Sequence, residues 1–131
     1  MSDRAFLAAL ESCELPAQEF DHVAHIRAAY LYLCEHGFAR GLEKMMKAIQ
    51  RYAAHLGQAG KYNETITVAY MALIQQHIVE RGHADEWAEF QRRNPELFAE
   101  DLLVQFYSAT QLNSESARRT FVLPRRVPAA G

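Results

Sequence analysis

The sequence has few cysteines and no long apolar run. Cys13 and Cys34 do not fit a Cys-x-x-Cys motif, so we expect both to stay reduced in a cytoplasm. No apolar stretch approaches the roughly 20 residues that cross a bilayer. The first residues also lack the apolar segment of a secretory signal peptide. These absences predict a cytoplasmic protein without a membrane partner.

An excess of positive charge is missing as well. Lys and Arg number 14 against 16 Asp and Glu, which gives a formal net charge of -2. Nucleic-acid binding relies on a broad cationic surface, so we expect no nucleic-acid partner. What the chain does have is a globular composition, with 131 residues of which 50% are hydrophobic. That length predicts a single helical domain over residues 1–123 and a flexible C-terminal tail over 124–131.

Helical periodicity determines the predicted fold class. Apolar residues recur every three to four positions, and Gly, Pro or capping residues separate the runs. The pattern predicts helices over residues 3–13, 22–35, 39–56, 64–81 and 97–107, with short helical turns near 85–93 and 114–119. We therefore expect an all-α protein: a compact helical bundle of about five to six helices, with short loops and an irregular C-terminal tail.

Two of these helices begin with polar clusters. Asp21 is a suitable N-cap for the helix over 22–35, whose first turn carries His22 and His25. Asn63 is the N-cap expected for the helix over 64–81, which starts at Glu64. Both clusters lie where backbone N–H groups are unpaired and the helix dipole is positive. If the connecting loops are short, both helices start at the same end of the bundle, and His22, His25 and Glu64 converge in one polar pocket.

One interpretation of this pocket is a metal-dependent active site. His22, His25 and Glu64 would be three ligands for zinc, copper or iron, with a position left open for water or substrate. In a catalytic site without a metal, Glu64 would be the general base, and His22 or His25 would position the substrate. The alternative is that the imidazoles only complete the hydrogen bonding of a helix end, with Glu64 as an ordinary first-turn acid.

A second interpretation is a small-molecule pocket. Two helix N-termini and Lys61 around a common depression suit an anionic ligand. The residues expected to bind it are Lys61, Tyr62, Asn63, His55 and Tyr30. The alternative to both interpretations is a non-enzymatic helical interaction or regulatory module, whose polar clusters only cap helices. The sequence does not decide the oligomeric state.

Four segments together resemble a family of small bacterial all-helical proteins with no established activity. They are FDHVAHIR at 20–27, KYNETIT at 61–67, the segment 87–97 ending in NPEL, and FYS at 106–108. The similarity extends from about Phe20 to Pro124. Relatives often have His where this chain has Asn63, which disfavours position 63 as a metal ligand here. The resemblance leaves His22, His25 and Glu64 as the expected ligands.

Overall fold

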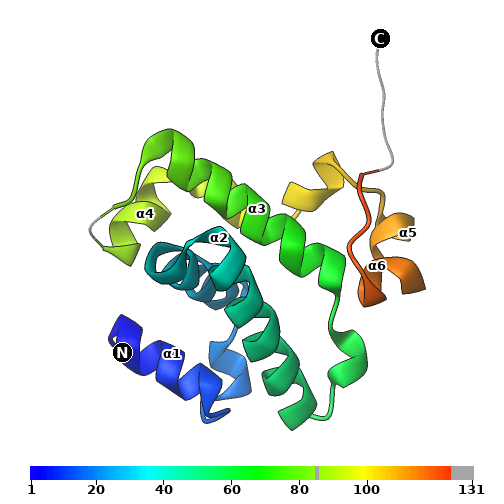
Figure 1. Ribbon diagram of the computed structural model, residues 1–131, viewed down its shortest axis with the longest axis horizontal. Coiled ribbons are helices and arrows are strands. Elements are labelled where there is room, and N and C mark those ends of the chain that lie inside the picture. Colours follow the sequence, from blue (N-terminus) through cyan, green and yellow to red (C-terminus); the bar gives the residue numbers. More distant parts are fainter. Residues whose placement is uncertain (85, 125–131) are drawn as a thin grey trace.

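The structure, a computed structural model, describes residues 1–84 and 86–124. Within these ranges it consists of helices and turns without any β-strand, so the predicted all-α fold is confirmed (Figure 1). The tail expected over 124–131 lies outside the described residues except for Pro124, and Asp85 lies outside them as well. None of the described helices is long and apolar enough to cross a membrane.

The N-terminal half consists of a short helix and a long, interrupted one. Helix α1 is Asp3–Glu11, and the Ser2 hydroxyl caps it by accepting a hydrogen bond from the Ala5 amide. Helix α2 is His22–His55, and its N-cap Asp21 accepts a hydrogen bond from the Ala24 amide at 2.9 Å. Gly37 interrupts α2 with a φ of 81°, a conformation that favours glycine. The predicted division into two helices is therefore confirmed, as a first arm (residues 22–36) and a second arm (residues 38–55).

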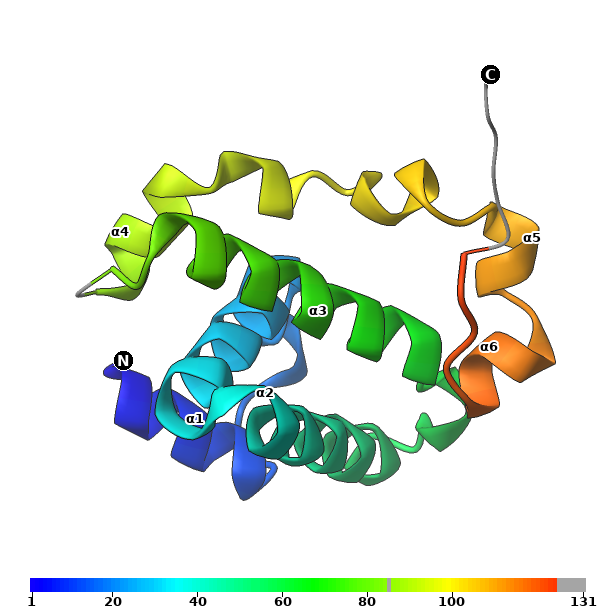
Figure 2. The same ribbon diagram turned by 45° about the horizontal axis from the view of Figure 1, so that its top comes forward.

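The two arms of α2 approach each other closely beyond the interruption. A Cβ atom added at Gly41 would lie 2.9 Å from the Tyr32 carbonyl oxygen, closer than real Cβ atoms come. The absence of a side chain at this position lets the second arm pack against the first. The two arms therefore form a wedge, and the third long helix lies across it (Figures 1 and 2).

Helix α3, Glu64–Arg81, is that third helix. The Asn63 side chain caps it by accepting a hydrogen bond from the Ile66 amide at 2.9 Å, and Gly82 ends it. Met71 and Ile74 are fully buried against α2 and complete the main core. Because caps and glycines are local signals, the bounds of α3 agree with the prediction over 64–81.

The C-terminal third is less regular than predicted. It contains α4 (Trp87–Arg93), the 3-10 turns η3 (Pro95–Phe98) and η4 (Leu102–Gln105), α5 (Ala109–Leu112) and α6 (Glu115–Arg119). The helix predicted over 97–107 is wrong, because Ala99 is extended between the two turns. Around one α-helix, Leu97 and Leu102 would lie about 140° apart at roughly 100° per residue. Two short turns bury both leucines as the segment runs beside α3 (Figure 2).

Candidate functional site

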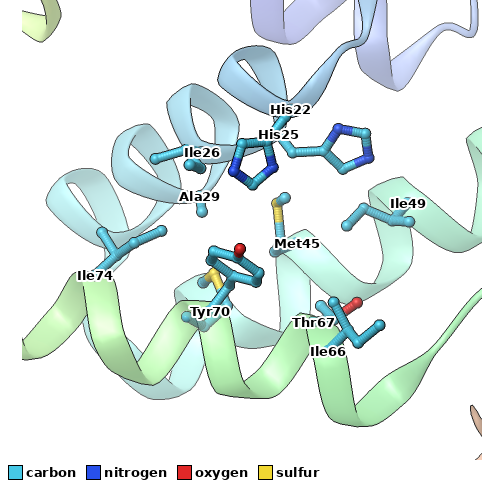
Figure 3. A pocket seen from close by; sticks show the side chains of 11 residues that line it. His22, His25, Ile26, Ala29, Met45, Ile49, Ile66, Thr67, Tyr70 and Ile74 are labelled. Atoms are coloured by element: carbon cyan, nitrogen blue, oxygen red, sulfur yellow. The ribbon is translucent and has the colours of Figure 1, made fainter. Parts of the chain in front are cut away.

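Two neighbouring hollows lie beside the arms of α2: both arms and α3 line the inner one, and the start of the first arm, the second arm and the loop before α3 line the outer one. The inner pocket has a volume of about 100 Å³, and its largely apolar wall includes His22, His25, Met45, Ile49, Tyr70 and Met71. In Figure 3 the two imidazoles lie on one side of this pocket, opposite the side chains of α3. The outer cleft has a volume of about 380 Å³, and its wall includes Phe20, His25, Ile49, Tyr52, Lys61 and Tyr62. His25 and Ile49 belong to both walls.

His22 lines the inner pocket and has an unpaired ring nitrogen. Its Nε2 atom is buried and has no hydrogen-bond partner in the described part of the chain. The ring meets Tyr70 edge to face, with 5.6 Å between the ring centroids. A buried polar atom without a partner costs about 1–3 kcal/mol. His22 is therefore destabilising in this arrangement unless another molecule supplies the missing hydrogen bond.

His25 is held in a defined orientation and protonation state. Its Nδ1 lies 2.8 Å from the Asp21 carbonyl oxygen, and its ring stacks on Phe20 with 3.8 Å between the centroids. Because a carbonyl oxygen only accepts, Nδ1 carries the proton and the neutral ring keeps a lone pair on Nε2. Burial lowers the pKa of His25 below its usual 6.5, although the hydrogen bond to Asp21 opposes this shift, and the nearby His22 lowers the pKa further. At neutral pH, His25 is therefore a hydrogen-bond acceptor through Nε2.

Tyr62 and Glu64 form a pair at the edge of the outer cleft. The Tyr62 hydroxyl donates a hydrogen bond to Glu64 Oε1 at 2.8 Å. Burial and this hydrogen bond raise the pKa of Tyr62, so the phenol keeps its proton. Lys61, which precedes Tyr62, is exposed and makes no ion pair with the described residues. The cleft thus has one uncompensated cation at its rim.

The structure does not bring Glu64 into the inner pocket with His22 and His25. His22 meets Tyr70, nearly two turns further along α3 than Glu64, and Glu64 does not line this pocket. Among the described residues, no three His, Cys, Asp or Glu side chains come together in a group that could hold a metal ion. The three-ligand site expected for zinc, copper or iron is therefore not formed by His22, His25 and Glu64.

Three other residues expected to bind ligand lie outside both hollows. Asn63 caps α3 and donates a hydrogen bond to the Leu112 carbonyl at 2.8 Å. Tyr30 is buried, donates to the Ala84 carbonyl and stacks on a core phenylalanine, and burial raises the pKa of Tyr30 to about 12. His55 is exposed at the end of α2. Of the predicted ligand-binding residues, Lys61 and Tyr62 line the outer cleft.

The sequence analysis did not identify the apolar residues of the two walls as part of a site. Met45, Ile49 and Tyr52 are spaced four and three positions apart, so they share one face of the second arm. That spacing indicates a buried face, and the same signal describes ordinary core. Only the packing of three helices shows that part of this face borders a hollow.

Comparison with known proteins gives no further assignment. No family model, no curated protein and no solved structure matches this chain. The resemblance to small bacterial helical proteins therefore stays a prediction. The function has to be inferred from the two hollows themselves.

Proposed function

We propose that this protein binds a small, largely apolar molecule in the inner pocket, with His22 Nε2 as its hydrogen-bond partner. The observation that supports the proposal is the buried, unpaired Nε2 atom of His22, a residue that lines that pocket. Folded proteins satisfy the great majority of their buried polar atoms. A ligand that hydrogen-bonds to His22 would remove the cost of the missing partner.

The size and chemistry of the pocket limit the ligand. Its volume of about 100 Å³ is smaller than the engineered apolar cavity of roughly 150 Å³ that holds benzene. Methionine side chains and Tyr70 surround the space, and methionine adapts to irregular shapes. We therefore expect a compact molecule, or a compact end of a larger one, with one nitrogen or oxygen that reaches His22.

Binding is favoured over metal-dependent catalysis at this place. A metal centre of the expected kind requires a third ligand within the same pocket, and Glu64 lies outside it. We also propose that the protein acts in the cytoplasm. Both cysteines are unpaired thiols, which is typical of a reducing compartment.

Calorimetric titration with pyrazole tests the proposed function. Pyrazole is a compact ring that both donates and accepts hydrogen bonds, so it suits either tautomer of His22. We expect saturable binding to the wild-type protein, loss of binding in His22→Leu, and wild-type binding in the control His36→Leu, whose ring lies outside the pocket. Absence of saturable heat with folded wild-type protein, or unchanged binding by His22→Leu, would overturn the proposal.

A further inference from the structure

The outer cleft combines apolar walls, two hydrogen-bond acceptors and one cation. From this combination we infer that it binds a small hydroxy acid, a molecule with a carboxylate, a hydroxyl group and an apolar skeleton between them. This second site is distinct from the inner pocket, although the two share His25 and Ile49. The inference therefore does not depend on binding of a ligand beside His22.

The walls of the cleft suit an apolar skeleton. Phe20 and Tyr52 meet at 78°, with 5.1 Å between their ring centroids, and Ile49 and Leu56 extend the apolar surface. The Tyr52 hydroxyl donates a hydrogen bond to the Leu15 carbonyl, so this phenol offers its ring rather than a proton. The volume of about 380 Å³ lies at the small end of the roughly 300–1,000 Å³ of ligand pockets. A molecule with a single ring fits this space.

The two hydrogen-bond acceptors of the cleft, His25 and Tyr62, favour a ligand with a hydrogen-bond donor. The Nδ1 proton of His25 is committed to the Asp21 carbonyl, which leaves the Nε2 lone pair to accept. No hydrogen bond from the described part of the chain reaches Nε2, and His25 is only partly buried. The Tyr62 proton is likewise committed to Glu64, so its oxygen can only accept, and a ligand would share this oxygen with the side chains of Thr67 and Gln50. A ligand hydroxyl would donate to either acceptor.

The charge of Lys61 favours a carboxylate as the second polar group of the ligand. Lys61 lines the cleft, and no described carboxylate pairs with it. Glu64 is close in sequence, but its Oε1 atom accepts the Tyr62 proton and its side chain does not line the cleft. A carboxylate on the ligand would supply the counter-charge, and a charge-assisted hydrogen bond is roughly twice as strong as a neutral one.

Titration with 4-hydroxyphenylacetate tests this inference in the full-length protein. Phenylacetate lacks the hydroxyl group, and 2-(4-hydroxyphenyl)ethanol replaces the carboxylate with an alcohol. We expect the affinity of each analogue to be lower than that of 4-hydroxyphenylacetate by about fivefold or more. Lys61→Gln should weaken binding of the hydroxy acid by about fivefold and leave binding of the alcohol unchanged. Lys47→Gln is the matched control, because Lys47 pairs with Glu43 on the exposed side of α2.

Three results would overturn the inference: no binding of 4-hydroxyphenylacetate, equal binding of the alcohol, or equal effects of the two lysine substitutions. The pyrazole titration separates these failures from a failure of the proposed function. If pyrazole binds and the hydroxy acid does not, the inner pocket is supported as a ligand site and the outer site is rejected. If the hydroxy acid binds through Lys61 and pyrazole does not bind, the outer site is supported and the proposed function of the inner pocket is rejected.

Discussion

Two histidines three residues apart on one helix have different chemistry. The ring of His25 finds the Asp21 carbonyl four residues earlier, which fixes its tautomer. His22 is the first residue of α2, and its Nε2 atom is buried without a hydrogen-bond partner in the described part of the chain. The two rings therefore differ in which nitrogen is engaged: Nδ1 of His25 is committed to a carbonyl, whereas Nε2 of His22 has no partner.

Leucine substitutions at the two histidines should have opposite effects on stability. His22→Leu removes an unpaired buried nitrogen and keeps an apolar side chain against Tyr70, so the free energy of unfolding should rise by about 1 kcal/mol. His25→Leu loses the hydrogen bond to Asp21 and the stacking on Phe20, so the free energy of unfolding should fall by about 1–2 kcal/mol. Urea unfolding measures both changes. A loss of stability in His22→Leu would show that its nitrogen is satisfied in the fold.

At the scale of elements, the interruption of α2 gives the site its shape. Gly37 ends the first arm with φ 81° and ψ -178°, and the second arm returns along it at Gly41. This reversal places Ile49 and Met45 beside the histidines of the first arm. A continuous helix would carry these side chains away from His22 and His25, and neither hollow would form.

Gly37→Ala should therefore be destabilising. Residues other than glycine rarely adopt this combination of φ and ψ, and such strain costs about 1–3 kcal/mol. Gly60→Ala is the control, because a Cβ atom there meets nothing within 4 Å and the backbone is not in the left-handed region. We expect a lower urea midpoint for Gly37→Ala and an unchanged or slightly higher one for Gly60→Ala. Equal midpoints would contradict the assigned role of Gly37.

Local signals explain why most elements could be predicted. Asp21 and Asn63 are caps whose side chains accept the expected amide hydrogen bonds, and glycines, Gly37 and Gly82, end two of the predicted helices. The prediction for residues 97–107 failed because its leucines are buried by contacts with other parts of the fold, which periodicity along the segment does not encode. Tertiary contact, rather than propensity, decides the local structure there.

The candidate site was also predicted only where local signals determine it. The sequence predicted that His22 and His25 share a pocket and that Lys61 and Tyr62 lie close by, because these pairs are neighbours in the chain. It did not predict the place of Glu64, which depends on the angle between the first arm and α3. No local pattern in the sequence sets that angle. The prediction that the three ligands come together was therefore wrong.

At the scale of the whole molecule, the C-terminal segment returns to the start of α3. The Thr65 hydroxyl donates to the Thr120 carbonyl at 2.8 Å and accepts from the Val122 amide at 3.1 Å. Tyr107 adds a hydrogen bond to the Val122 carbonyl. These contacts fix the beginning of α3, and with it the loop that carries Lys61 to the outer cleft.

Stability should fall in two steps as the pH is lowered. The pKa of His25 is lowered by burial in the folded state, so below about pH 6.5 the unfolded chain takes up a proton that the folded chain resists, and stability falls. The pKa of Glu96 is lowered from 4.5 by its own backbone N–H and by Arg81 and His77, so its contribution is present above pH 4.5 and is lost below it. Urea unfolding between pH 8 and 3 measures both steps.

Single substitutions assign the two steps. His25→Gln should flatten the step that begins near pH 6.5 and leave the lower one in place. Glu96→Gln should do the opposite, since it removes the carboxylate that faces Arg81 and His77. A wild-type protein whose stability rises between pH 7 and pH 5.5 would contradict the protonation state assigned to His25.

The most direct test is the ¹⁵N chemical shift of the imidazole nitrogens of the wild-type protein during titration with pyrazole. We predict that the Nε2 resonance of His22 moves and saturates, because that atom gains its missing hydrogen bond. The resonances of His77 should not move, since both of its nitrogens already face partners, the Leu73 carbonyl and Glu96. A His22 Nε2 resonance that stays unchanged throughout the titration, in folded protein, would contradict a ligand site at this pocket.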